Sequence, residues 1–193
     1  INSEKLIVIF QSAKKSKVNF NQKKNWITFV GKLNKAKGYD VFAKTIQRIL
    51  NKYPNWKAKI IGDEKREKIS LNHKNADVLG FLSHEKVLKV FEKTSIAVAC
   101  SRWEEPFGRT SLEASASGCA VIITNKGGLP ETVTNAKIIK NLSISNLEKV
   151  IKKLIDNIKL RKEYQKLSIE NFYLTHEYVT EKIDTYRDEK LKY

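Results

Sequence analysis

The chain has 193 residues, of which 41% are hydrophobic and 9% aromatic, and it carries a formal net charge of +16. This composition fits one globular domain with a real core and excludes a disordered chain. It also excludes a membrane-spanning helix, because no apolar run approaches roughly 18 residues, and the N-terminus lacks the pattern of a signal peptide.

The large positive charge leaves two interpretations open. A basic surface attracts nucleic acid, anionic membranes or phosphorylated ligands. All but six of the 37 basic residues are lysine, however, and this favours a bias of composition over a surface tuned for recognition. The chain also does not begin with methionine, so we expect a fragment of a longer protein.

The two cysteines, Cys100 and Cys119, lie among apolar or small residues. We expect buried free thiols in a reducing cytosol rather than a disulfide, which a domain of this size does not need. The three histidines have no metal-ligand spacing relative to these cysteines. We therefore expect neither a metal site nor a bound cofactor.

The first part of the chain predicts a strand, a polar connector and the first core strand. Residues 4–10 are a short apolar run typical of a strand, and residues 11–25 are polar and basic without an apolar period. Residues 26–30 are β-branched and aromatic, which is typical of a buried parallel strand. A basic loop bounded by glycines, residues 31–38, leads into a helix predicted over 39–53 from the helical spacing of its apolar residues.

Strands and helices then alternate. Further strands are predicted at 57–62, 77–81, 96–100, 120–124 and 136–140, and helices at 83–94, with Ser83 as N-cap, and at 109–117. A Gly-Gly turn opens a short helix near Pro130, and the pattern from residue 147 onwards is helical. This order predicts an α/β protein, a Rossmann-like parallel sheet flanked by helices on both faces, with a long C-terminal helical tail.

Three unusual loops follow predicted strands, and ligands of open parallel sheets bind beyond the carboxyl ends of the strands. The first loop contains Lys32 and Lys37 between Gly31 and Gly38. Glycines allow a phosphate to approach the backbone, and lysines neutralise its charge. The loop has neither the ending of a Walker A motif nor the G-x-G-x-x-G pattern, so its basic residues alone indicate a site only weakly.

The second loop, residues 101–108, leads into a predicted helix that begins at Gly108, Arg109 and Thr110. Free amides and the dipole at a helix start favour an anion. The third loop is the Gly-Gly turn after residue 124. We expect all three loops to meet at one edge of the sheet.

Two glutamates bracket the second loop. Glu113 falls near the first turn of the helix, where it either accepts hydrogen bonds from ribose or sugar hydroxyls or is simply favoured by the helix dipole. Glu105 either contacts a ligand or is a solvated loop charge beside Glu104. Spacing alone leaves both alternatives open.

Four motifs, taken together, resemble a known family. The segments GKLNKAKG, GFLSHEKV, SRWEEPFGRTSLEASASGCAVI and GGLPE resemble the C-terminal, nucleotide-sugar-binding domain of retaining glycosyltransferases of the GT-B fold, the group 1 or family 4 class. The resemblance covers roughly residues 26–135. The form that these motifs take in this sequence resembles bacterial glycosyltransferases of the lipopolysaccharide core, including mannosyltransferases.

The resemblance implies a role for each candidate residue. Five groups would bind the donor diphosphate: Lys32, Lys37, Gly108, Arg109 and Thr110. The nucleobase would meet the loop formed by Phe81, Leu82 and His84. Of the two glutamates, Glu113 would bind the ribose diol, and Glu105 would be the catalytic carboxylate at the transferred sugar.

The resemblance also implies the organisation and the partners. Residues 1–25 would be a linker or the remnant of a missing N-terminal domain, residues 26–158 the nucleotide-sugar-binding domain, and residues 159–193 C-terminal helices. The donor would be a GDP- or UDP-linked sugar used without a metal, and the missing domain would bind a glycolipid acceptor. We expect a cytoplasmic protein with peripheral contact to the anionic inner face of the cytoplasmic membrane, and no nucleic-acid partner.

Two other functions compete with this interpretation. A basic nucleic-acid-binding module would explain the charge and the clusters KKSK and QKKN, but no groove-reading or RNA-binding motif is present. A sugar-nucleotide epimerase would share the GT-B fold. A phosphorylase would need a pyridoxal-binding lysine motif, which the sequence lacks.

Overall fold

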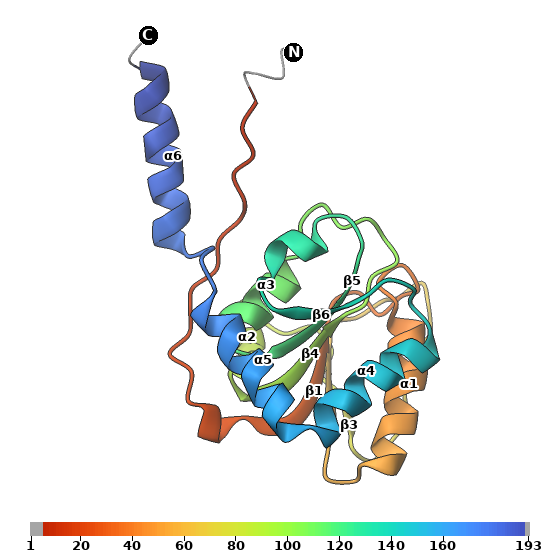
Figure 1. The fold of residues 1–193 in the computed structure, drawn as a ribbon. Coiled ribbons are helices and arrows are strands. Elements are labelled where there is room, and N and C mark those ends of the chain that lie inside the picture. The colour runs from red at the N-terminus through yellow and green to blue at the C-terminus, as the bar shows by residue number, and fades with distance from the viewer. Residues whose placement is uncertain (1–5, 192–193) are drawn as a thin grey trace.

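The computed structural model describes residues 6–191, with the side chain of Leu191 left out. Six parallel strands form one sheet in the order β3-β2-β1-β4-β5-β6 (Figure 1). The strands are β1 (Lys24–Val30), β2 (Lys57–Ile61), β3 (Ala76–Val78), β4 (Thr94–Ala99), β5 (Ala120–Thr124) and β6 (Ala136–Ile139). The predicted α/β class and the parallel sheet are confirmed.

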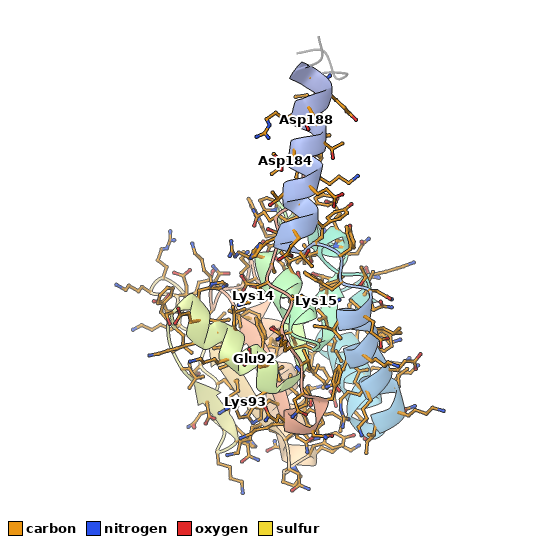
Figure 2. All side chains as sticks on the ribbon, turned by 90° about the vertical axis from the view of Figure 1, so that its left-hand side faces the viewer. Lys14, Lys15, Glu92, Lys93, Asp184 and Asp188 are labelled. Carbon is orange, nitrogen blue, oxygen red and sulfur yellow. The ribbon has the colours of Figure 1, made fainter. Side chains whose placement is uncertain are left out.

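Helices cover both faces of the sheet (Figure 1). They are α1 (Tyr39–Lys52), α2 (His84–Lys93), α3 (Arg109–Ala116), α4 (Ile144–Asp156) and α5 (Ile158–Glu170), and two short 3-10 helices are η2 (Phe20–Gln22) and η3 (Leu129–Thr132). The last helix, α6 (His176–Leu191), carries Asp184 and Asp188 and extends away from the sheet (Figure 2). It forms the end of the predicted helical tail.

The alternation of side chains along the central strands explains the two apolar layers. Ile27 and Phe29 of β1 belong to the same buried cluster as α1 and α4. On β5, Ile122 joins that cluster, whereas Val121 and Ile123 pack in a second cluster that contains side chains of α2 and α3. A parallel sheet covered on both faces needs such continuous apolar strands, as their sequences predicted.

The N-terminal prediction was wrong in part. Residues 6–10 form no strand, and residues 4 and 5 of the predicted run lie outside the described residues. The segment runs beside the start of α6 instead of pairing with the sheet. Phe10 stacks on Phe107 with ring centroids 5.6 Å apart, and the Ala13 amide donates to Leu174 O at 3.0 Å. These contacts hold Phe10 and Ala13 to the domain, whereas Ile7 and Val8 are exposed.

The other differences are small. The third strand ends at Val78 rather than at residue 81, because Gly80 turns the chain with φ +65°. The fourth strand spans Thr94–Ala99 rather than 96–100. Ser83 occupies the N-cap position of α2, but its side chain makes no capping hydrogen bond.

The connector before β1 is fixed to the domain by a half-buried lysine. Lys23 Nζ donates to Phe91 O at 3.0 Å and to Ser117 O at 2.7 Å, at the ends of α2 and α3. Burial lowers the pKa of Lys23, while the Cys119 thiol 3.8 Å away works in the opposite direction. Both cysteines are buried free thiols, as expected.

Arg161 of α5 contacts both the end of α4 and Trp56, the residue before β2. Its Nη1 donates to Leu154 O at 2.7 Å and to Ile155 O at 3.0 Å, and its guanidinium carbon lies 5.0 Å from the centre of the Trp56 ring. The residue is 8% exposed, and burial lowers its pKa. The charge is therefore compensated by the carbonyl end of α4 and by the indole face.

We expect Arg161→Ala to lower the free energy of unfolding by about 2–4 kcal/mol, because two charge-assisted hydrogen bonds and a buried stem are lost. Urea denaturation measures this loss. The matched control is Arg187→Ala on α6, where the side chain is 63% exposed and a change within about 0.5 kcal/mol is expected. Equal effects of the two substitutions would contradict the capping role.

Candidate functional site

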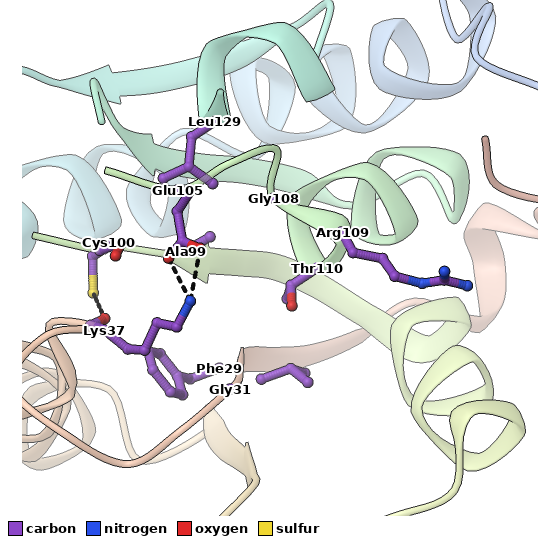
Figure 3. Close-up of a pocket in the computed structure, with 12 residues that line it drawn as sticks. Phe29, Gly31, Lys37, Ala99, Cys100, Glu105, Gly108, Arg109, Thr110 and Leu129 are labelled. Carbon is purple, nitrogen blue, oxygen red and sulfur yellow. Dashed lines mark hydrogen bonds and ion pairs between the residues drawn. The ribbon is translucent and has the colours of Figure 1, made fainter. Parts of the chain in front are cut away.

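The loops after β1, β4 and β5 meet at the carboxyl edge of the sheet, as predicted. They enclose a cavity of about 240 Å³ between the end of β1 and the start of α3 (Figure 3). Its lining consists of Phe29, Val30, Gly31, Lys37, Ala99, Cys100, Ser101, Glu105, Gly108, Arg109, Thr110 and Leu129.

A lysine and a glutamate form a direct ion pair in the lining of this cavity. Lys37 Nζ lies 2.6 Å from Glu105 Oε1 and 2.7 Å from Oε2, and Figure 3 shows the two side chains pointing toward one another. The side chain of Lys37 is 33% exposed and that of Glu105 only 11%. The pair therefore presents a cation to the cavity and balances the charge of a nearly buried carboxylate.

The lysine loop is held against the end of β4 by a close backbone approach. Gly38 is the N-cap residue of α1 with φ +72°, and a Cβ atom at this position would lie 1.9 Å from Cys100 O. No side chain fits there without moving the backbone. Glycine thus allows the neighbouring Lys37 to reach the cavity.

An ion pair that spacing could not reveal also joins these two loops. Arg102 Nη1 and Nη2 donate to Asp40 Oδ1 and Oδ2 at 2.6 and 2.9 Å. Burial works to raise the pKa of Asp40, but the hydrogen bonds and charge of Arg102 outweigh it and lower the pKa. The Arg102 amide also donates to Ala36 O at 2.8 Å. Two residues that are 62 positions apart in sequence carry no local signal of such a contact.

The Gly-Gly turn supports the glutamate loop through the backbone. The Gly128 amide donates to Glu105 O at 2.7 Å, and a Cβ atom at Gly127 would lie 2.2 Å from the same oxygen. Glu104 accepts from Lys126 Nζ at 2.7 Å and from the Gly127 amide at 2.6 Å, and these bonds lower its pKa. Glu104 thus binds the Gly-Gly turn and holds it in place, whereas Glu105 faces the cavity.

The start of α3 borders the cavity. Gly108 takes φ +112°, and a Cβ atom there would meet Leu129 Cδ2 at 2.6 Å. Arg109 and Thr110 follow as the first helical residues, and their backbone amides have no carbonyl partner within the helix. Figure 3 shows the Arg109 side chain extending away from Lys37 and Glu105.

Glu113 lies one turn further along α3 and is only 6% exposed. Its Oε1 accepts from Arg109 Nε at 2.7 Å and lies 2.9 Å from His84 Nε2. Burial of this carboxylate requires such partners, because an unpaired buried charge is strongly unfavourable.

The candidate residues divide into two groups. Five of them line the cavity: Lys37, Glu105, Gly108, Arg109 and Thr110. The others lie outside the lining: Lys32, Phe81, Leu82, His84 and Glu113. Among these, Lys32 is exposed, Phe81 is 81% exposed, and Leu82 packs partly against the apolar cluster between α2 and the sheet.

A parallel sheet of this order, with a cavity at the carboxyl ends of its central strands and a helix start beside it, defines a Rossmann-like α/β domain. The sequence pattern described as "Glycosyl transferases group 1" matches residues 10–170. The chain therefore belongs to the group 1 glycosyltransferases.

Individual relatives agree with this assignment. The chain is 31% identical over 165 residues to the uncharacterized glycosyltransferase MJ1178 of Methanocaldococcus jannaschii, an alignment that covers 81% of this chain and 45% of the relative. The chain spans between just over a quarter and just under half of the length of these curated relatives.

Two solved structures show the same fold. The C-terminal domain of the group 1 glycosyl transferase LpcC from Francisella tularensis is 24% identical, with a TM-score of 0.69, over 81% of this chain and 92% of that domain. A variant of TarM from S. aureus, in complex with fondaparinux, alpha-GlcNAc-glycerol and UDP, is 19% identical with a TM-score of 0.80. That match covers 96% of this chain and 40% of TarM.

None of the helices within residues 6–191 has the length and apolar character of a membrane span. No group of three or more histidine, cysteine, aspartate or glutamate side chains within this range is arranged to hold a metal ion.

Proposed function

We propose that this chain is the donor-binding domain of a metal-independent retaining glycosyltransferase. It would take a hexose, mannose-like, from a GDP- or UDP-linked donor and transfer it to a lipopolysaccharide or another surface-glycan acceptor. The observation that carries the proposal is the Lys37–Glu105 pair in a cavity bordered by the start of α3. The UDP in the related TarM structure supports a nucleoside diphosphate as ligand.

The cavity supplies what cleavage of the donor requires. When the bond between the anomeric carbon and the diphosphate breaks, negative charge develops on the leaving diphosphate and positive character on the sugar. Lys37 and the free amides at Gly108, Arg109 and Thr110 would stabilise the diphosphate. Exposed Lys32 would add charge from the same loop, without the bidentate geometry of an arginine. These cations serve the role that a metal ion has in other transferases.

The two glutamates would have different tasks. Glu105, held beside the ammonium of Lys37, would face the transferred sugar and favour the positive character of its anomeric carbon. Glu113 lies next to the cavity on α3 and would accept a hydrogen bond from the ribose. Phe81, with its ring open to solvent before α2, would lie against the nucleobase together with Leu82.

The acceptor would bind to a second, N-terminal domain. Residues 6–10 and α6 leave the sheet domain side by side (Figure 1) and border an apolar groove that includes Ile7, Val8 and Tyr178. Ile7 is 51% exposed and Val8 is 79% exposed. Ile183 on α6 is 46% exposed. We infer that this apolar surface packs against the acceptor domain, since such surfaces commonly mark interfaces.

The charge of the chain suits a membrane-bound acceptor. Exposed lysines such as Lys14 and Lys15 project from the connector (Figure 2). We propose a cytoplasmic protein that touches the anionic inner face of the membrane, where each basic side chain near the surface contributes about 1 kcal/mol. We expect no nucleic-acid partner, because the sequence has no groove-reading or RNA-binding motif.

The experiment is a calorimetric titration of the chain with UDP, GDP and ADP, and in parallel with a single-stranded oligonucleotide. We expect one nucleoside diphosphate to bind at submillimolar concentration, and Glu113→Ala to weaken it about 10- to 100-fold by removing a charge-assisted hydrogen bond. Glu148→Ala is the matched control, because Glu148 lies on α4, where it pairs with Arg48 of α1 and does not line the cavity. The proposal fails if no nucleoside diphosphate binds at millimolar concentration while the oligonucleotide binds tightly.

A further inference from the structure

The loop after β4 carries an exposed tryptophan. Trp103 is 60% exposed, and among the exposed large apolar side chains of residues 6–191 it is the only one that comes from the three loops around the cavity. Within the same range, no aromatic ring or cationic side chain stacks on its indole, and its hydrogen bonds use the backbone amide alone. The indole is therefore available to a ligand.

The backbone of this loop is fixed on both sides of the tryptophan. The Trp103 amide donates to Ala36 O at 3.1 Å. On one side, Arg102 is held by its ion pair with Asp40, and on the other, Glu104 is bound to the Gly-Gly turn. An aromatic ring carried by such a backbone has few positions to choose from, so little conformational freedom is lost when a ligand binds to it.

These contacts also place the tryptophan next to the ion pair of the cavity. Ala36, which accepts the hydrogen bond from the Trp103 amide, directly precedes Lys37 in the chain, and Glu105 lies two residues after Trp103. Lys37 and Glu105 form the ion pair that Figure 3 shows in the cavity lining. Trp103 is not part of that lining, so it borders the cavity from outside.

The surroundings of the indole favour a sugar over an apolar protein surface. A pyranose ring has a face of C–H groups that packs on the electron-rich face of an aromatic ring, and hydroxyl groups at its edge that need hydrogen-bonding partners. Charged side chains flank Trp103 in the chain, with Arg102 41% and Glu104 66% exposed. They can bind hydroxyl groups, whereas an apolar protein surface would desolvate them at a cost.

We propose that Trp103 is a stacking platform for a pyranose ring at the edge of the donor cavity. This inference rests on the proposed function and deepens it, because it names a residue that recognises the sugar. The ring comes from one of two sources, the hexose of the donor or the acceptor glycan, and both present the same C–H face. Stacking holds the sugar beside the Lys37–Glu105 pair.

The test compares sugar binding by the 193-residue chain and by Trp103→Ala. Calorimetry compares UDP with UDP-glucose and GDP with GDP-mannose, and NMR titration follows methyl α-mannopyranoside and methyl α-glucopyranoside. If the hexose of the donor stacks on Trp103, the variant weakens binding of the nucleotide sugar about fivefold or more and leaves the free diphosphate within about twofold. If the acceptor stacks there, the nucleotide sugars stay within about twofold, and a methyl glycoside is weakened about fivefold or more.

Either of these results supports the inference. It is overturned if Trp103→Ala binds all of these sugars as tightly as the unchanged chain does. It is also overturned if the variant weakens the free diphosphate as much as the nucleotide sugar, because the indole would then act on the nucleotide.

Three further variants separate stacking from other effects. Trp103→Phe keeps an aromatic face and is expected to bind the sugar within about threefold of the unchanged chain; a loss equal to that of Trp103→Ala would contradict stacking. Phe20→Ala changes a 38% exposed aromatic residue before β1, at the opposite edge of the sheet, and leaves all affinities unchanged. Phe81→Ala weakens the free diphosphate and the nucleotide sugar by the same factor, as expected for a contact with the nucleobase.

The failure of this inference is distinguishable from the failure of the proposed function. If the unchanged chain binds UDP or GDP and the sugars do not respond to Trp103→Ala, only the inference fails. If it binds a methyl glycoside through Trp103 but no nucleoside diphosphate, the proposed donor site fails and the sugar platform stands. If the chain binds neither nucleotides nor sugars, both fail. The urea midpoint of Trp103→Ala should match that of the unchanged chain, since the replaced side chain is exposed.

Discussion

Replacing Lys37 by methionine is expected to weaken binding of the nucleoside diphosphate about 100-fold or more. Loss of a charge-assisted hydrogen bond to a phosphate oxygen accounts for about 1.5–3 kcal/mol, which corresponds to roughly 10- to 150-fold. A second effect adds to it, because Glu105, only 11% exposed, then faces the diphosphate without its cation. Calorimetric titration at two salt concentrations measures both affinity and its ionic component.

The double variant Lys37→Met/Glu105→Gln isolates this second effect. Removing the uncompensated carboxylate should recover about 5- to 10-fold of the lost affinity, a coupling that is expected for side chains in direct contact. Glu105→Gln alone should bind the diphosphate within about threefold of the unchanged chain, because Lys37 remains. If Lys37→Met binds the nucleotide as tightly as the unchanged chain, the diphosphate does not bind in this cavity.

The largest loss of stability is expected from Gly38→Ala, at about 3–5 kcal/mol. The left-handed conformation at φ +72° costs a residue with a side chain about 1–2 kcal/mol. The added methyl group would also lie 1.9 Å from Cys100 O, so the start of α1 must move away from the end of β4. Urea denaturation gives the free energy of unfolding.

Gly80→Ala is the matched control, because Gly80 has φ +65° but no atom within 4 Å of an added Cβ. In this variant the free energy of unfolding should fall only by the cost of the left-handed conformation, about 1–2 kcal/mol. Equal losses of stability in the two variants would mean that the close contact with Cys100 O is relieved without any cost in free energy. Gly38→Ala should also weaken nucleotide binding, since Lys37 precedes it directly, whereas Gly80→Ala is not expected to do so through the lysine loop.

Much of the fold could be predicted from local patterns. The β-branched runs at β1, β4 and β5 and the helical spacing over α1 and α4 are properties of short segments, and the structure has these elements within a few residues of their predicted bounds. The same patterns misled at residues 6–10, where an apolar run packs beside α6 rather than in the sheet. Local sequence cannot distinguish a strand from an extended apolar segment that runs along a distant helix.

The sequence by itself determined the alternation of strands and helices, and with it the edge of the sheet where the lysine loop, Glu105 and the start of α3 would meet. Parallel strands place their carboxyl ends together whatever the details of the side chains. Only the tertiary structure decided which side chains pair there. Lys37 and Glu105 are 68 positions apart, and His84 and Glu113 are 29 apart. Contacts between distant segments depend on how the helices pack, and no local preference of the chain encodes that packing.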